Sequence, residues 1–320
     1  MEITEVKVAK LTMLLQNNLP QYYAVVDLGS NSFHMLITCL IDNKITVIDK
    51  IKRKVRLASG LNKQNQLSTT VMTTGLNCLA IFAQHLSSIP LDNIRIVATA
   101  TLRLATNRDD FLLQANNILP IPITLLTGEQ EAATIYSGVA YTCDEMSKRL
   151  VIDIGGASTE LIVGQSVHAL HSVSLNIGCV TFNKNYFGDG LLSESNFNDA
   201  IEASIDVISP HANRFMSLGW KTVLGSSGII QALIEILAYQ NRPLIVTTVF
   251  LYEIQQQLIA FVNIDNIHIN GLRADRIAVL ASGLSILIAL FECLKIERLS
   301  LSKGALREGL LFGMLPKSVN

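Results

Sequence analysis

Short hydrophobic runs alternate with polar turns along the first part of the chain. Four runs rich in Val, Ile and aromatic residues lie at residues 23–26, 33–40, 45–48 and 51–57. With turn residues at 29–31 and 42–43, they predict a β-meander. The next predicted elements are a helix at 71–85, a strand at 94–98, a helix near 109–117 and a strand at 121–125.

The same plan recurs in the second half of the chain. Thr127 and Gln130 form a capping-box pattern that opens a helix through Ala140. The later predicted elements are strands at 150–154, 160–163, 168–175, 220–224 and 299–302, with helices from 193, at 229–238 and at 304–314. Strand-turn-strand loops and strand-to-helix glycine loops that both occur twice predict a two-lobed α/β architecture.

Composition supports a folded chain with two sizeable cores. Apolar residues make up 49% of the 320 residues and charged residues only 16%. Mean hydropathy is high, at +0.38, so a membrane span has to be considered. The longest uncharged run, 277–291, is short for a span and contains Ser and Gly, and we expect a buried helix there. Charged residues are scattered through the first ten positions, which does not fit a signal peptide.

The cysteines and the net charge indicate the cellular location and the kinds of partner to expect. Five widely spaced cysteines, an odd number, favour reduced thiols in a cytoplasmic protein over a disulfide framework. A net charge of −1 argues against a general nucleic-acid binder, so a polyanion would be held by a local cluster. We therefore expect no nucleic-acid or membrane partner, and the sequence leaves homodimerisation open.

Two stretches 126 positions apart share one motif, YAVVDLGSNS at 23–32 and LVIDIGGAST at 150–159. In each, an apolar run ends in Asp, with Gly two positions later and Ser five positions later. An acid, a glycine that lets backbone N–H groups approach an oxyanion, and a hydroxyl are parts of a phosphate-and-metal site. The repetition predicts a duplicated fold whose two phosphate loops face each other across a cleft.

Six segments in order resemble the exopolyphosphatase / guanosine pentaphosphate phosphohydrolase family. They are YAVVDLGSNSFHML (23–36), ATATLRLATN (98–107), TGEQEA (127–132), VIDIGGASTE (151–160), GSSG (225–228) and GALREG (304–309). The resemblance implies the two-lobed actin-like (ribonuclease H-like) ATPase fold, with duplicated domains and a central cleft. The segment IKRKVRLASGLN (51–62) and the ending ALREGLLFGML are more similar to the guanosine pentaphosphatase branch.

The resemblance also implies a domain plan. We expect a first actin-like domain at 1–129, a second at 130–307, and a closing helix at 308–320 that packs back on the first. Longer family members continue into a helical region associated with gripping long polyphosphate and with dimerisation. The sequence ends at Asn320 without a match to that region, so processive action on long polymers is not expected.

The family resemblance and the chemistry of the side chains together predict the catalytic residues. Glu131 matches the family's catalytic glutamate and is the predicted general base. Its competitor Glu129 would lie on nearly the opposite helix face. Arg103 matches an arginine of the family's TATLR segment, and a guanidinium clamps phosphate oxygens well. Asp153 and Glu160 suit Mg²⁺, while Asp27, the symmetry mate of Asp153, either joins them at the metal or orders its own loop.

The substrate's phosphates are expected on the glycine loops, through backbone N–H groups and hydroxyls. The predicted binding residues are Gly29, Ser30, Asn31, Ser32, Gly155, Gly156, Ala157, Ser158, Thr159, Gly225, Ser226, Ser227 and Gly228. Lys52, Lys54 and Arg56 alternate along a predicted strand and form either a cationic face for a phosphate chain or an ordinary solvated face. His34 either touches phosphate or is a satisfied core residue.

These features predict a Mg²⁺-dependent phosphoanhydride hydrolase with a small polyanion substrate. We expect removal of the terminal phosphate of guanosine pentaphosphate, with inorganic polyphosphate trimmed from its end as the alternative. An actin-like kinase that phosphorylates a small acceptor and a sensor that binds without hydrolysis are the other classes. The chain lacks a Gly-x-x-x-x-Gly-Lys-Ser/Thr loop and a Cys-x-x-Cys pair, and its six histidines are scattered.

Overall fold

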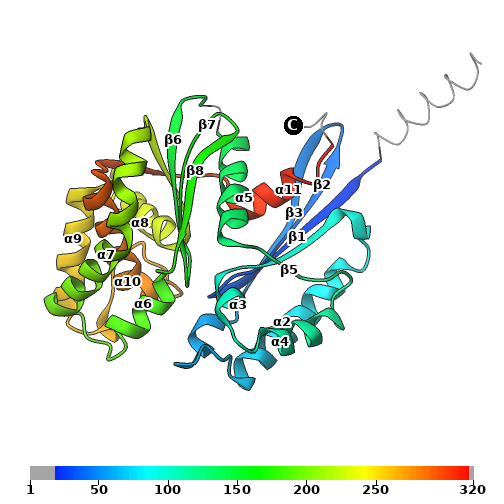
Figure 1. The fold of residues 1–320 in the computed structure, drawn as a ribbon, viewed down its shortest axis with the longest axis horizontal. Coiled ribbons are helices and arrows are strands. Elements are labelled where there is room, and N and C mark those ends of the chain that lie inside the picture. The colour runs from blue at the N-terminus through cyan, green and yellow to red at the C-terminus, as the bar shows by residue number, and fades with distance from the viewer. Residues whose placement is uncertain (1–18, 144, 317–320) are drawn as a thin grey trace, which may run out of the picture.

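The computed structural model describes residues 19–143 and 145–316, which form two lobes that lie side by side (Figure 1). One mixed sheet forms the centre of each lobe. The first sheet contains β1 (Gln21–Leu28), β2 (Ser32–Ile41), β3 (Lys44–Lys54), β4 (Ile94–Ala98) and β5 (Thr124–Leu125). The second contains β6 (Lys148–Ile154), β7 (Thr159–Gln165), β8 (His168–Leu175), β9 (Thr222–Ser226), β10 (Val246–Thr247) and β11 (Arg298–Leu301).

The two sheets have the same strand order. The first runs β3-β2-β1-β4-β5, and the second runs β8-β7-β6-β9-β11 with β10 added at its edge. In both, the first three strands are antiparallel and the next ones join in parallel. The predicted two-lobed α/β fold with duplicated domains is therefore confirmed.

Helices cover the outer faces of both sheets. On the first sheet these are α2 (Thr69–Leu86) and α4 (Arg108–Asn116). On the second they are α6 (Cys179–Tyr186), α7 (Glu194–Leu218), α8 (Gly228–Tyr239), α9 (Thr248–Phe261) and α10 (Ile277–Leu294). Short elements are α3 (Ala100–Leu104) and the single turns η1 (Leu57–Gly60), η2 (Leu91–Asn93) and η3 (Ile264–Asn266).

Two helices lie between the sheets, α5 (Gly128–Tyr141) and α11 (Leu306–Phe312) (Figure 1). Tyr136 and Val139 of α5 pack against the second sheet. Leu311 of α11 packs with Val25 and Leu36 of the first sheet. The predicted capping box is present, because Gln130 N–H donates to Thr127 Oγ1 and Thr127 N–H donates to Gln130 Oε1. The cap makes α5 begin at the cleft side of the molecule.

The expected domain division, after residue 129, falls within the first turn of α5 and stays a prediction. Residues 1–18 of the expected first domain and 317–320 of the expected closing helix lie outside the described residues. Helix α10 is three residues longer than the predicted run at 277–291. Its 18 residues, with a mean hydropathy of 2.3, are long and apolar enough to cross a membrane, but 72% of that window is buried inside the protein.

One strand prediction was wrong. The runs at 45–48 and 51–57 form a single strand, β3, which ends at Lys54. Arg56 has a left-handed backbone with φ of 57°, and its N–H donates to Asn31 O at 2.8 Å. The chain turns there toward the first glycine loop. Lys52, Lys54 and Arg56 therefore do not form one continuous strand face.

Candidate active site

The two repeated Asp residues end equivalent central strands. Asp27 lies on β1 opposite His34 of β2, and Asp153 lies on β6 opposite Glu160 of β7. In both hairpins the pairing joins the Asp to the residue seven positions later. Parallel pairing also sets Asp153 beside Ser226 of β9, whose hydroxyl donates to the Asp153 carboxylate at 2.9 Å.

The two glycine loops meet at their tips. A Cβ added to Gly156 would lie 2.7 Å from Cβ of Ser30, so the loops approach more closely than side chains would permit. Within each loop the turn is tight as well, since a Cβ on Gly155 would lie 3.0 Å from Ser158 O. Both loops therefore need glycine, and they close one end of the space between the lobes.

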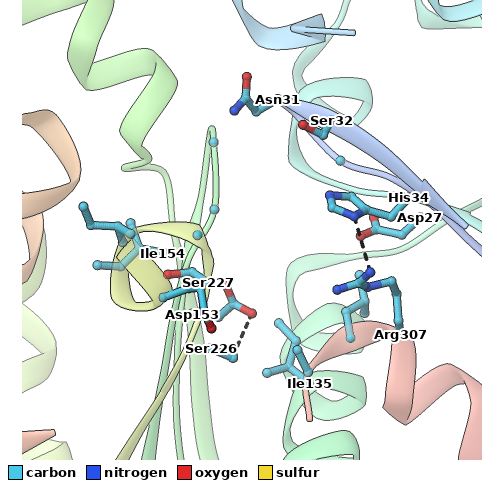
Figure 2. A pocket seen from close by; sticks show the side chains of 18 of the residues that line it. Asp27, Asn31, Ser32, His34, Ile135, Asp153, Ile154, Ser226, Ser227 and Arg307 are labelled. Atoms are coloured by element: carbon cyan, nitrogen blue, oxygen red, sulfur yellow. Dashed lines mark hydrogen bonds between the residues drawn. The ribbon is translucent and has the colours of Figure 1, made fainter. Parts of the chain in front are cut away.

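A cleft of about 400 Å³ lies between the lobes. Asp27 and Asp153 approach it from opposite walls, with Ile135 of α5 between them at one end (Figure 2). Its lining includes most of the predicted site, namely Asp27, Gly29, Ser30, Asn31, Ser32, Glu131, Asp153, Gly155, Gly156, Ser158, Glu160, Ser226, Ser227 and Gly228.

Glu131 lies in the first turn of α5, and its side chain is 8% exposed. The neighbouring acid Glu129 is exposed to solvent, so the helix directs only Glu131 into the cleft. Arg103 of α3 donates to the Glu131 carboxylate at 2.5 Å and to Leu126 O at 3.1 Å. Arg103 is not among the lining residues itself, but it contacts one that is.

Burial raises the pKa of four acids that line the cleft. It brings the pKa of Asp27 to about 7, where the charge of Glu131 adds to the rise and Arg307 opposes it. Burial, with Glu131 and Asp27 nearby, raises the pKa of Asp153 to about 8. The pKa of Glu131 is also raised by burial, against the opposing effect of Arg103. Burial and the neighbouring acids hold the pKa of Glu160 well above its ordinary value.

These acids suit a hard divalent cation that arrives with a phosphate ligand. Among the described residues, no three His, Cys, Asp or Glu side chains converge into a ready-made metal site. Mg²⁺ usually takes one or two carboxylates and completes its shell with water and phosphate oxygens. Asp27 and Asp153 offer such carboxylates, and the burial that raises their pKa values disfavours a bare negative charge, which a bound cation would neutralise. Glu160 accepts a hydrogen bond from Ser174 at 2.7 Å and lies deeper.

Free hydroxyls in the cleft suit an anion. Ser32 Oγ and Ser227 Oγ are buried and have no hydrogen-bond partner within 19–143 and 145–316. Ser227 precedes α8, whose N-terminal N–H groups carry partial positive charge. A Cβ on Gly228 would lie 1.8 Å from Arg276 Nη1, so this guanidinium covers the first turn of α8.

Three residues predicted to bind phosphate do not line the cleft. Thr159 is fully buried and donates its hydroxyl to Ile177 O at 2.7 Å. Ala157 packs in a small apolar cluster with Ala58 and Ala100. Gly225 faces the core, where a Cβ would lie 2.3 Å from Ile230 Cδ1. A role in phosphate binding stays a prediction for these three residues.

Several cations of the cleft were not predicted as site residues. They are Lys50, Arg276, Lys303 and Arg307. Arg307 belongs to the GALREG segment, and this resemblance to the family could have identified it as a site residue. His34 also lines the cleft, and its Nδ1 lies 3.3 Å from Arg307 Nη1. Burial, reinforced by Arg307 and Lys52, lowers the pKa of His34 to about 3, so its imidazole is neutral.

Residues 36–318 of the chain match the Ppx/GppA phosphatase family. The chain belongs to this family. The predicted resemblance is thereby confirmed for most of the sequence, including all of the glycine loop at 155–159 and the GALREG segment.

Curated relatives of this Ppx/GppA chain include two bacterial proteins named guanosine-5'-triphosphate,3'-diphosphate pyrophosphatase. The one from Pseudoalteromonas translucida is 52% identical over 298 residues, and the one from Vibrio cholerae serotype O1 is 49% identical over 293. The alignments cover 93% and 92% of this chain but only 60% and 59% of those proteins. The chain thus spans about 60% of the length of these relatives.

Solved structures of other proteins share the fold of the Ppx/GppA chain. A Cytophaga hutchinsonii exopolyphosphatase has a TM-score of 0.83 at 21% identity, covering 92% of this chain and 97% of its own. The PPX-GPPA enzyme of Aquifex aeolicus has a TM-score of 0.74 at 22% identity, covering 92% of this chain and 100% of its own. The predicted actin-like fold class is confirmed.

Proposed function

We propose that this chain is a phosphoanhydride hydrolase that converts guanosine pentaphosphate to the tetraphosphate and inorganic phosphate. The observation that carries the proposal is Glu131, a carboxylate buried in the cleft between two matched glycine-serine loops and 2.5 Å from Arg103. Relatives about half identical to this chain are named guanosine-5'-triphosphate,3'-diphosphate pyrophosphatase, which supports the choice of substrate.

Glu131 is the proposed general base. A water in the cleft would give a proton to the Glu131 carboxylate as its oxygen attacks the terminal phosphorus, in line with the departing phosphate. The raised pKa of Glu131 brings this base closer to neutral pH, where proton transfer is most effective. Because α5 presents Glu131 to the cleft and Glu129 to solvent, only Glu131 has the required position.

Several groups would stabilise the charge on the phosphates. Arg103 is the proposed clamp for the transferred group, since a guanidinium neutralises oxyanions and donates two parallel hydrogen bonds. The unpartnered hydroxyls of Ser32 and Ser227 are available to phosphate oxygens from the two walls of the cleft. The backbone N–H groups in the first turn of α8 would bind the other phosphates of the substrate.

Asp27 and Asp153 are the proposed ligands of Mg²⁺, with Glu160 behind them. When bound, the cation would neutralise charge on the phosphate oxygens. The chain's own part is to hold two carboxylates on opposite walls and to keep Asp153 oriented through the Ser226 hydroxyl. Glu160 is held in turn by Ser174.

Inorganic polyphosphate, shortened from its end, is the alternative substrate. The lysines and arginines of the cleft suit either polyanion, and both substrates present a terminal phosphoanhydride. Phosphate release from guanosine pentaphosphate and from polyphosphate, compared at equal concentrations of chain ends, distinguishes them. Transfer of phosphate from ATP to a metabolite would favour the kinase class instead, and binding without turnover would favour the sensor.

Glu131→Gln tests the central assignment. We expect the variant to lose about 100-fold or more of its turnover, since a positioned base contributes about that much, and to keep substrate binding. Glu129→Gln is the matched control, because that acid lies two positions away on the exposed face of the same helix. Full turnover in Glu131→Gln would remove this residue from the mechanism.

The five cysteines are free, which supports activity in the cytoplasm. The bacterial origin of the relatives fits this location. Homodimerisation stays a prediction.

A further inference from the structure

Arg307 is one of the charged residues of the cleft that have no assigned part in the proposed mechanism. Arg307, in the GALREG segment, lies in the first turn of α11, where this helix meets the cleft. Its guanidinium points toward the space between Asp27 and Asp153 (Figure 2). Its charge lowers the pKa of both carboxyls, which agrees with this position.

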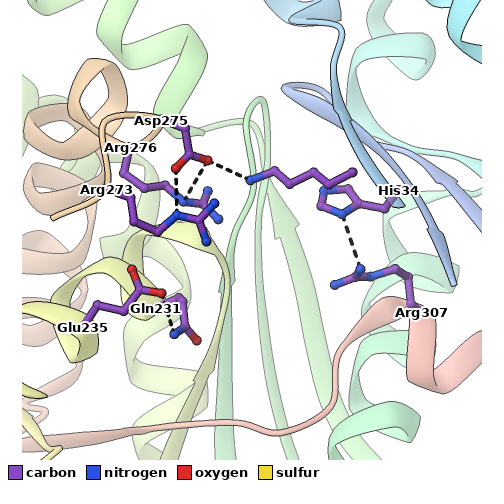
Figure 3. Close-up of polar contacts among 8 residues, drawn as sticks. His34, Gln231, Glu235, Arg273, Asp275, Arg276 and Arg307 are labelled. Atoms are coloured by element: carbon purple, nitrogen blue, oxygen red, sulfur yellow. Dashed lines mark hydrogen bonds and ion pairs between the residues drawn. The ribbon is translucent and has the colours of Figure 1, made fainter. Parts of the chain in front are cut away.

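Most N–H donors of the Arg307 guanidinium have no partner among the described residues. None of the ion pairs among the described residues includes it. Its one side-chain hydrogen bond in that part of the chain joins Nη1 to His34 Nδ1, at 3.3 Å (Figure 3). A guanidinium has five N–H donors and no acceptor, so His34 must accept this bond. The other donors remain available in a cleft that would hold phosphate oxygens.

Close helix packing fixes Arg307 relative to Glu131. Helices α5 and α11 touch through backbone atoms, because a Cβ on Gly138 would lie 2.0 Å from Ala305 O and one on Gly309 would lie 1.9 Å from Thr134 O. Farther along the pair, the ring of Tyr141 on α5 stacks on that of Phe312 on α11, with centroids 4.6 Å apart. The helix that carries the proposed base and the helix that carries Arg307 therefore form one rigid pair.

We propose that Arg307 binds the phosphate chain of the substrate, as a second guanidinium in addition to Arg103. His34 is then a positioning residue that directs Arg307 into the cleft. This inference rests on the proposed function and adds two residues to it. Arg103 is held by Glu131 and Arg307 by His34, so the two guanidinium groups have different partners. Two planar clamps suit a substrate with several consecutive phosphates.

Arg307→Gln tests the contact with phosphate. Binding of tripolyphosphate, measured by calorimetry in a Glu131→Gln background, should weaken about 10- to 100-fold, the range for losing hydrogen bonds to a charged group. Arg298→Gln, at an exposed arginine on β11, is the matched control and should bind as before. Equal affinity with and without Arg307, or no tripolyphosphate binding by either protein, would overturn the proposal. Because this readout needs no turnover, it is separate from the test of hydrolysis.

The positioning role of His34 has its own test. His34→Leu should lower kcat/KM, and His34→Gln, which keeps an acceptor, should restore most of it. In an Arg307→Gln background, His34→Leu should cause no further loss, because its effect passes through Arg307. Melting temperatures establish that each variant is folded. Equal losses from His34→Leu in both backgrounds would show that His34 does not act through Arg307.

Discussion

The carboxylate of Glu131 lies 2.5 Å from a guanidinium nitrogen of Arg103. The proposed base and the proposed phosphate clamp thus form an ion pair in a cleft where both would act. Arg103 offsets part of the cost of burying Glu131, and its charge opposes the rise in the pKa of Glu131. A substrate phosphate that engages Arg103 would weaken this pair and leave Glu131 a stronger base.

Removing Arg103 should therefore change the pH dependence as well as the rate. In Arg103→Gln the pKa of Glu131 loses its main lowering influence and rises, so the acid limb of the kcat/KM profile moves to higher pH. Arg103→Lys keeps the charge and should leave the limb near its original position while lowering the rate. The profile is measured by phosphate release over a pH series. An acid limb that does not move in Arg103→Gln would mean that Glu131 is not the group that titrates.

Asp153 should make the protein less stable at alkaline pH. Its pKa is raised from 3.8 to about 8, so the folded state binds this proton more tightly than the unfolded state does. Unfolding then releases the proton over the window between these values, and the free energy of unfolding falls as pH rises through it.

Asp153→Asn removes this titration. Without added metal, it should melt higher than the unsubstituted protein at about pH 9 and differ less at about pH 5. Each kcal/mol recovered corresponds to about 2–4 °C. The control is Asp206→Asn, on the exposed face of α7. A variant that melts lower than the parent at alkaline pH would contradict the assignment.

Divalent cations should reverse the same effect. Mg²⁺ stabilises the carboxylate forms of Asp27 and Asp153, so adding it at alkaline pH should raise the melting temperature of the unsubstituted protein. The rise should be smaller in Asp153→Asn. Chelation with EDTA should abolish phosphate release, and Mg²⁺ should restore it. Turnover that survives exhaustive chelation would contradict the proposed role of these two carboxylates.

The repeated motif predicted the architecture well. An Asp at the end of a β-prone run, followed by Gly and Ser at fixed spacing, identifies a strand-turn-strand unit by local chemistry alone, and two copies indicated two equivalent sheets. Helix geometry predicted that only one of Glu129 and Glu131 could face the cleft, and the family resemblance selected Glu131. The structure has Glu131 buried and Glu129 exposed.

Other parts of the site depend on packing that is not local. Arg307 and Arg276 reach the cleft from elements whose positions are set by contacts with distant segments, such as the backbone contact between α5 and α11. Thr159 has a hydroxyl of the expected type, but its bond to Ile177 O depends on a segment 18 residues away. Arg56 continued an alternating pattern, yet the strand had already ended at Lys54.

The glycine contact between α5 and α11 should be sensitive to a single methyl group. Gly138→Ala would place a Cβ 2.0 Å from Ala305 O, so the helices must separate. We expect a loss of about 1–3 kcal/mol in the free energy of unfolding, the usual range for overpacking, with a lower kcat. Gly313→Ala, where the nearest atom would be 3.4 Å away, is the control and should be nearly neutral in urea denaturation. Equal stability of the two variants would show that the helices are free to move apart.

An ion pair beside the cleft joins the two lobes. Lys52 of β3 lies 3.2 Å from the carboxylate of Asp275, which also pairs with Arg273 at 3.0 Å (Figure 3). Arg276 Nε lies 3.9 Å from the same carboxylate, so Asp275 engages three cations that a polyanion would otherwise attract. Both partners are partly exposed, so the pair itself should stabilise the fold by less than about 1 kcal/mol.

Asp275→Asn should therefore leave the melting temperature almost unchanged and lower the KM for the polyanion about two- to fivefold, the ratio that corresponds to an exposed ion pair. The gain should shrink as salt is added, because screening weakens the attraction of the released cations. Asp265→Asn, at an exposed acid of η3, controls for the change in net charge. Initial rates of phosphate release over a substrate series at two salt concentrations measure the effect. A raised KM in Asp275→Asn would instead mean that the carboxylate holds Lys52 in the orientation that substrate needs.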